Sequence, residues 1–313
     1  TLLEGAYAFL VMTKDEMIVA RDRHGLRPLS LGKLGESYVV ASETCAFDLI
    51  GAETIRSIEP GEMLIINEDG LTSIQYEEVT NRAMCAMEYV YLARPDSDID
   101  GINVHMARKR MGKQLAKECM HIEADVVTGV PDSSISAAIG FAEESGLPYE
   151  LGLIKNRYVG RTFIQPTQEL RERGVKMKLS PVVQVVKGKR VVMVDDSIVR
   201  GTTSRRIVKM LKEAGAAEVH VVISSPPMTD PCYYGIDTST TEELIASNHS
   251  VEEIRDMIGA DSLTFLSVDG MVNSIDRPYE DESKGLCLAC FTSKYPTEIF
   301  SDTILPHEKE LQI

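Results

Sequence analysis

The sequence lacks any run of about 18 consecutive apolar residues, and its start lacks the basic segment of a secretory signal. We therefore expect no membrane span and a cytoplasmic protein. Basic residues are also few, since 33 Lys and Arg stand against 48 Asp and Glu, a formal net charge of −15. This balance argues against nucleic-acid binding, which needs a basic face to neutralise phosphates. Tryptophan is absent as well, but its absence excludes no class of protein.

The 313 residues are 43% hydrophobic, which is enough for sizeable cores and excludes disorder as the main state. At about 150 residues per domain, the length predicts roughly two domains. The chain begins at Thr1 rather than at a methionine, so we interpret it as a fragment or a processed product.

Residues 1–76 have the pattern of a β-rich domain. Short apolar runs separated by turn residues predict an antiparallel sheet, and they occupy residues 6–12, 17–20, 38–41 and 63–66. About 70 residues are few for an independent β domain. We therefore expect residues 1–76 to be the last part of a larger one, and residues 77–313 to form the second domain.

From about residue 104, strand and helix patterns alternate, which predicts a doubly wound parallel α/β sheet. Strands are expected over residues 125–130, 149–155, 190–194 and 218–224. Helices are expected over residues 106–119, 134–145, 204–214 and 241–257, with a helix start at Ser250.

The strongest motif is VVMVDDSIVRGTT, residues 191–203. A buried strand delivers Asp195 and Asp196 to its carboxyl end, where open α/β sheets bind ligands. The following turn and helix start favour a phosphate, with Gly201 allowing close approach. The two carboxylates suit ribose hydroxyls or Mg²⁺ instead. An acidic turn that only caps a helix is the alternative, and the Walker pattern is missing.

This motif resembles the phosphoribosyl-pyrophosphate (PRPP) signature of type I phosphoribosyltransferases. Four further segments narrow the resemblance to the glutamine PRPP amidotransferase family: EYVYLARPDS (88–97), TGVPDSS (128–134), KNRYVGRTFIQP (155–166) and KYPTEIF (294–300). The resemblance runs along essentially the whole chain. It implies a type I phosphoribosyltransferase domain, preceded by the C-terminal part of a β-rich N-terminal-nucleophile glutaminase domain.

The resemblance implies a reaction in which ammonia, released from glutamine, displaces the pyrophosphate of PRPP to give 5-phosphoribosylamine, the first step of purine synthesis. It assigns Asp195 and Asp196 to the ribose hydroxyls and, with Ser133, to Mg²⁺. It assigns the 5′-phosphate loop to Ser197, Val199, Arg200, Gly201, Thr202 and Thr203. It assigns the pyrophosphate loop to Val130, Pro131, Asp132 and Ser133, although a plain capped turn there remains an alternative.

Residues 155–166 would form the loop that closes over PRPP, and a solvated basic loop is the alternative. Its expected catalytic residues are Lys155, Arg157, Tyr158 and Arg161. The family is regulated by purine nucleotides, and Lys155, Arg157 and Ser197 are the candidates for contacts to inhibitor phosphates. The resemblance also implies a homotetramer.

Six cysteines in a long acidic chain without an export signal argue against a disulfide scaffold. The CxxC of Cys287 and Cys290 suits zinc, a cluster or redox chemistry. The cysteine pattern resembles the iron–sulfur branch of the family, like that of Bacillus, and so implies a 4Fe–4S cluster held by Cys85, Cys232, Cys287 and Cys290, with zinc as the alternative. Cys45 and Cys119 are expected to be buried thiols.

The family's glutaminase nucleophile is an N-terminal cysteine, and no cysteine precedes Cys45 here. Thr1 is a weak candidate for a replacement nucleophile, because the sequence motifs that follow it match the later part of the glutaminase domain. We expect an inactive glutaminase half and ammonia-dependent transfer. A regulator that binds PRPP or nucleotides without turnover is the alternative function, and a poorly folded fragment is the third possibility.

Overall fold

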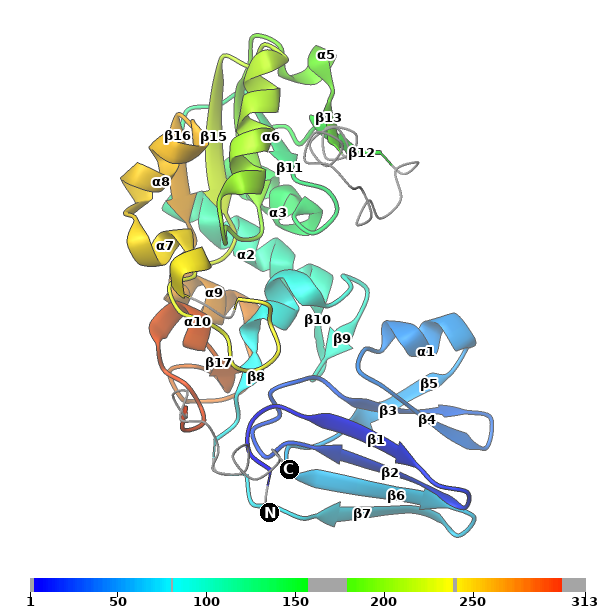
Figure 1. Ribbon diagram of the computed structural model, residues 1–313. Helices are drawn as coiled ribbons and strands as arrows, with labels where there is room; N and C mark the ends of the chain where they lie inside the picture. The colour runs from blue at the N-terminus through cyan, green and yellow to red at the C-terminus, as the bar shows by residue number, and fades with distance from the viewer. Residues whose placement is uncertain (1–2, 80, 157–178, 239–240, 300–313) are drawn as a thin grey trace, which may run out of the picture.

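The computed structural model describes residues 3–79, 81–156, 179–238 and 241–299. Figure 1 shows two lobes. The N-terminal lobe contains residues 8–75, and the α/β lobe contains residues 104–275. A junction lies between them, built from residues 83–103 and 276–292. None of the helices in the described ranges combines the length and the apolar character that a bilayer crossing requires.

The N-terminal lobe consists of two antiparallel sheets, which confirms the antiparallel prediction. The first sheet has the order β1 (Ala8–Met12), β2 (Glu16–Arg21), β6 (Glu62–Asn67), β7 (Gly70–Gln75). The second has the order β4 (Ser37–Ala41), β3 (Ser30–Leu34), β5 (Glu53–Ser57), with the short helix α1 (Cys45–Ile50) beside it. The small core of this lobe contains Val19, Leu29, Leu31, Ile58 and Leu64. The sequence pattern missed β3, β5, β7 and α1.

The α/β lobe is built on a four-stranded parallel sheet, as predicted. Its order is β11 (Val126–Gly129), β14 (Arg190–Asp195), β15 (Glu218–Ile223), β16 (Ser262–Phe265). Consecutive β14 residues alternate between two cores: Val192 and Val194 belong to one and Val191 and Met193 to the other. Both sets are fully buried, because helices cover both faces of a doubly wound sheet.

One face of this sheet is covered by α2 (Val104–Glu118), α3 (Ile135–Ser145) and α9 (Val268–Ile275), and the other by α6 (Thr202–Glu213) and α8 (Val251–Ile258). Helices α2 and α3 approach closely at two glycines. A Cβ on Gly112 would lie 1.9 Å from the Ala137 carbonyl oxygen, and a Cβ on Gly140 would lie 1.9 Å from that of Lys109. Glycine is therefore required at this helix crossing.

Two predicted elements differ from the structure. The strand expected over 149–155 is interrupted. Tyr149 forms an isolated parallel bridge with Val127 of β11, whereas β12 (Leu153–Lys155) pairs antiparallel with β13 (Leu179–Pro181), ahead of the short α5 (Val183–Val186). The helix expected over 241–257 is three short helices, η2 (Thr241–Glu243), α7 (Ile245–Asn248) and α8. The break is at Ser250, whose side chain and that of Glu253 form a capping box, so the helix start predicted there is confirmed.

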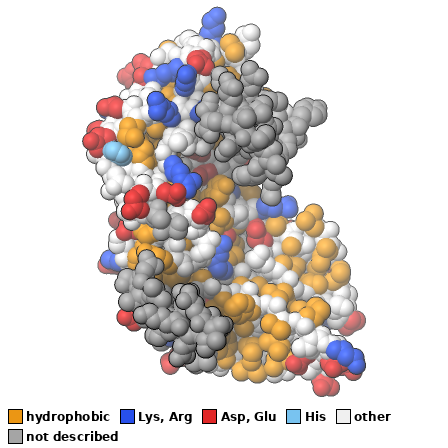
Figure 2. All heavy atoms as spheres, viewed as in Figure 1, with side chains coloured by type: hydrophobic (Ala, Val, Ile, Leu, Met, Phe, Trp, Pro, Cys, Tyr) orange, Lys and Arg blue, Asp and Glu red, His pale blue; other side chains and the backbone are white. Residues whose placement is uncertain are grey.

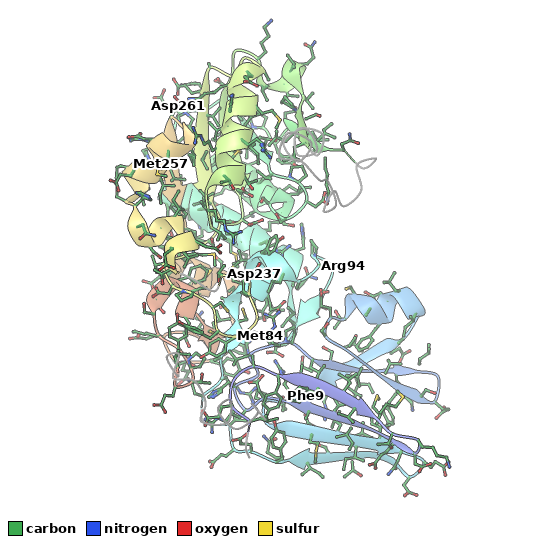
Figure 3. All side chains as sticks on the ribbon, viewed as in Figure 1. Phe9, Met84, Arg94, Asp237, Met257 and Asp261 are labelled. Carbon is green, nitrogen blue, oxygen red and sulfur yellow. The ribbon has the colours of Figure 1, made fainter. Side chains whose placement is uncertain are left out.

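The junction contains β8 (Met84–Cys85), the π-helical turn η1 (Glu88–Leu92), the hairpin of β9 (Asp98–Ile99) and β10 (Ile102–Asn103), β17 (Leu286–Cys287) and α10 (Ala289–Thr292). Polar contacts fasten it to the N-terminal lobe. Glu43 Oε2 accepts hydrogen bonds from the Arg94 backbone N–H at 2.7 Å and from Ser97 Oγ at 2.8 Å. Arg94, labelled in Figure 3, thus lies where the two lobes meet.

Candidate active site and cysteine cluster

The two adjacent aspartates lie at the carboxyl end of β14, as the sequence predicted. Asp195 and Asp196 are both buried, and serine side chains surround their carboxylates. Ser134 Oγ donates to Asp195 Oδ1 at 3.0 Å, and Ser197 Oγ donates to Asp196 Oδ1 at 2.8 Å. Ser133 Oγ donates to Asp196 Oδ2. The serines of the loop after β11 therefore contact the aspartates at the end of β14, because these parallel strands are neighbours.

Burial raises the pKa of Asp195, and the neighbouring Asp196 carboxylate raises it further. Burial also raises the pKa of Asp196, against hydrogen bonds from Ser133 and Ser197 that lower it. Two adjacent carboxylates removed from water repel each other when both are ionised. A divalent cation or a set of hydroxyl donors at this position would relieve that repulsion, which is the chemistry that the two aspartates suit.

A cavity of about 560 Å³ opens at these carboxylates. The loop of residues 195–204 lines it, together with Val130 and Ser133. Gly201, at φ +72°, is the N-cap of α6, so the first turn of that helix faces the cavity. The amino end of a helix favours an anion such as a phosphate. The cavity therefore combines the amino end of a helix, which suits an anion, with a pair of acidic side chains.

A second cavity of about 440 Å³ lies on the other side of Ser133. Pro131, Asp132 and Ser133 line it, and the peptide bond between Pro131 and Asp132 is cis. Lys155 Nζ forms an ion pair with Asp132 Oδ2 at 2.5 Å, and both side chains are exposed. The structure thus brings Lys155 to the predicted pyrophosphate loop. The other predicted loop residues, Arg157, Tyr158 and Arg161, lie outside the described residues.

The sequence analysis assigned no role to several residues of these cavities. Tyr91 and Leu92 line both cavities, and Arg94 and Arg108 line the smaller one. The larger one also includes Met87, Met228 and residues 235–238. A signal existed for Arg108, since it is an arginine on the otherwise apolar face of α2. For Tyr91, Leu92 and Arg94, only the segment EYVYLARPDS (88–97) marked the region, and it does not include Met87, Met228 or residues 235–238.

All six cysteines are free thiols. Cys85 on β8 and Cys287 on β17 are directly paired across a parallel bridge. The backbone N–H groups of Thr229 and Asp230 donate to the Cys290 carbonyl oxygen at 3.0 and 3.2 Å, which holds the segment of Cys232 beside α10. Cys85, Cys287 and Cys290 therefore lie in the junction, and the segment that carries Cys232 lies beside it.

Burial raises the pKa of the Cys85 thiol to about 12, and Cys287 contributes to the shift. Burial also raises the pKa of the Cys290 thiol. The nearby thiols of Cys85, Cys287 and Cys232 raise it further. A thiolate is disfavoured in such a site unless a cation compensates its charge. Within the described ranges, however, no three Cys, His or acidic side chains are placed so as to hold a single metal ion.

Comparisons with known proteins agree with this geometry. Residues 99–243 match the family model of the phosphoribosyl transferase domain, and residues 1–48 match that of a glutamine amidotransferase domain. The chain is 71% identical over 310 residues to the amidophosphoribosyltransferase of Bacillus subtilis, and 55% identical over 299 residues to that of Staphylococcus aureus. These alignments cover 99% and 95% of the chain, and 65% and 60% of the relatives. The chain thus spans slightly less than two thirds of the length of each of these two relatives.

Two solved structures are also similar. Glutamine PRPP amidotransferase from B. subtilis, complexed with ADP and GMP, superposes with a TM-score of 0.91 at 71% identity, over 98% of this chain and 67% of its own. A structure described as the allosteric regulatory enzyme of purine biosynthesis superposes with a TM-score of 0.92 at 70% identity, over 98% of this chain and 66% of its own. By sequence identity and fold together, the chain belongs to the amidophosphoribosyltransferase family.

Proposed function

We propose that this chain binds PRPP with Mg²⁺ and transfers ammonia to it, releasing pyrophosphate and 5-phosphoribosylamine. The observation that carries the proposal is the buried pair Asp195 and Asp196 beside a cavity that the loop of residues 195–204 lines. In the reaction, the ammonia nitrogen bonds to the anomeric carbon while the bond from that carbon to the pyrophosphate oxygen breaks. The pyrophosphate leaves with the bonding electrons, and the new ammonium group loses a proton.

In this proposal the 5′-phosphate binds the loop of residues 197–203 and the first turn of α6. The ribose hydroxyls donate to the carboxylates of Asp195 and Asp196. The pyrophosphate lies in the smaller cavity, near Asp132, Ser133 and Lys155. Mg²⁺, held by Asp195, Asp196 and Ser133, would neutralise the leaving group's charge. Binding and orientation of the substrate, rather than a nucleophilic side chain, supply the catalysis.

The 313 residues by themselves are proposed to use ammonia and not glutamine, because no cysteine precedes Cys45. The test measures pyrophosphate release from PRPP and Mg²⁺, with ammonium or with glutamine as the nitrogen donor. Release with ammonium alone supports the whole proposal, whereas robust use of glutamine contradicts the donor assignment. Binding of PRPP without release under either condition would favour the alternative, a regulator that only binds PRPP.

We further propose that Cys85, Cys232, Cys287 and Cys290 hold a 4Fe–4S cluster that fastens the C-terminal segment to the junction. Support comes from the burial of Cys85, Cys287 and Cys290 and from the pairing of β8 with β17, which sets Cys85 beside Cys287. Such a cluster supplies cross-linking and no step of the reaction. Lys155, Arg157 and Ser197 are proposed contacts for nucleotide inhibitors, and a homotetramer remains a prediction.

The cluster is tested by the variant Cys287→Ser in anaerobically purified protein. Loss of iron and sulfide, with a lower thermal midpoint, is expected because one of four thiolate ligands is gone. Cys119→Ser is the matched control, since Cys119 is also buried but lies at the end of α2. Iron content that stays unchanged in Cys287→Ser would rule out the ligand assignment.

A further inference from the structure

The turn η1 forms the wall that separates the two cavities of the site. Tyr91 and Leu92 line both cavities, Met87 lines the larger, and Ala93 lines the smaller. A π-helix is uncommon and often marks a functional position. One i to i+5 hydrogen bond joins the Ala93 N–H to the Glu88 carbonyl oxygen at 3.1 Å. The turn is only five residues long, so contacts from outside it matter for its shape.

One guanidinium supplies those contacts. Arg108, from the buried face of α2, donates from Nε to the Tyr89 carbonyl oxygen at 2.7 Å and from Nη2 to the Ala93 carbonyl oxygen at 2.8 Å. These carbonyls lie at the two ends of the turn, so the planar fork of one arginine spans it. The side chain is only 2% exposed. Such burial of a charge is costly unless hydrogen bonds and opposite charges offset it.

Three carboxylates supply the opposite charge, and one of them, Asp196, belongs to the site. Burial lowers the pKa of Arg108, and the carboxylates of Asp196, Glu43 and Glu88 raise it in return. Arg108 also lines the smaller cavity together with Ser133, which donates to Asp196. The same guanidinium therefore supports the cavity wall and places a fixed positive charge near the metal and ribose carboxylates.

We propose that Arg108 is a positioning residue of the PRPP site: its guanidinium fixes the turn η1 between the two cavities and keeps a positive charge beside Asp196. The inference rests on the proposed function. It assigns a role to a side chain on the core face of α2, where an apolar residue would otherwise pack. On the N-terminal side, Glu88 of the same turn pairs with Arg27 at 3.2 Å, so the turn is held from both lobes.

The chain offers a close control for this role. Arg110, on the same helix, also bridges two backbone carbonyls: Nε donates to Ser274 at 2.6 Å and Nη2 donates to Ile275 at 3.1 Å. Those carbonyls lie at the end of α9, and Arg110 lines neither cavity of the site. Arg110→Met removes a comparable pair of hydrogen bonds without changing the site.

The experiment measures binding of PRPP in the presence of Mg²⁺ by calorimetry, and the thermal midpoint, for the full chain and for Arg108→Met, Arg108→Lys and Arg110→Met. Arg108→Met is expected to weaken PRPP binding about tenfold or more, the size of one lost charge-assisted contact. Arg108→Lys keeps the charge and is expected to recover part of the affinity. Arg110→Met is expected to lower the thermal midpoint with PRPP affinity within about twofold of the parent.

Equal PRPP affinity in Arg108→Met and Arg110→Met would overturn the inference. If Arg108→Met does not fold by circular dichroism, Arg108→Lys decides: weaker PRPP binding than in Arg110→Met supports the role, and unchanged binding overturns it. Failure of the unsubstituted chain to bind PRPP is a different result. It would overturn the proposed function, and this inference with it.

Discussion

The two lobes bury their sheets in different ways. In the α/β lobe, Val191 to Val194 of β14 are fully buried because helices cover both faces. In the N-terminal lobe, Phe9, Leu10, Val11 and Met12 of β1 are 45–78% exposed. Figure 2 shows apolar side chains gathered on the surface of that lobe, and Figure 3 labels Phe9 there. One lobe thus has a closed core around a site, and the other has an open apolar surface.

The closed core carries several energetically costly features, although the N-terminal lobe also buries charged side chains at Arg21, Asp22 and Glu62. Two buried carboxylates, a buried arginine and a close helix crossing are all in or next to the α/β lobe, where surrounding packing can hold them. The N-terminal lobe has a small core and presents an edge strand, which is a common place for association. Substitutions should therefore have large effects in the first lobe and small effects at the open face of the second.

The largest effect is expected at the aspartate pair. Asp195→Asn combined with Asp196→Asn should reduce PRPP turnover about a hundredfold or more, because the site loses both anionic ligands. The fold should persist, since the asparagine oxygens can still accept hydrogen bonds from Ser133 and Ser134. Pyrophosphate release and circular dichroism are the measurements. Retained turnover would contradict the proposed role of the two carboxylates in holding Mg²⁺ and the ribose hydroxyls.

The same variant has a pH signature. Both aspartates have pKa values raised by burial, so the folded chain binds protons that the unfolded chain has released above about pH 4. The parent without Mg²⁺ should therefore lose stability as the pH rises above that value, until the folded-state pKa values are passed. The double variant should be more stable than the parent at pH 8, and the difference should shrink toward pH 4.

The next largest effect is expected at the helix crossing. Gly112→Ala should lower the free energy of unfolding by about 3 kcal/mol, because the new Cβ meets the Ala137 backbone. Lys113→Ala is the control at the same crossing, since it removes only an exposed ion pair with Glu143. Its expected cost is about 0.5 kcal/mol. Urea unfolding measures both, and equal losses would contradict the close-packing explanation.

The smallest effect is expected at the open face. Val11→Lys should change the free energy of unfolding by no more than about 0.5 kcal/mol, because Val11 is 53% exposed on an edge strand. It should also reduce self-association, measured by sedimentation velocity. Val192→Lys is the matched substitution in β14 and should prevent folding, because it buries an unpaired charge. Unfolding by Val11→Lys would show that this face is packed after all.

Local sequence signals predicted the regular parts of the molecule well. The buried strand before Asp195, the amphipathic helix after Gly201 and the capped start at Ser250 each depend on neighbouring residues, so the pattern alone identified them. Elements of the N-terminal lobe such as β3 and β5 were missed, because their strands carry charges, Gly and Thr and lack a continuous apolar run.

The sequence by itself determined the α/β alternation, the acidic pair behind a phosphate loop and the family, because each is encoded in contiguous residues. Only the tertiary structure decided that Ser133 contacts Asp196, that Cys85 pairs with Cys287, and that Arg108 spans a π-helical turn between two cavities. Those contacts join residues 15 to 202 positions apart. They depend on strand order and helix packing, which no local pattern of polar and apolar residues specifies.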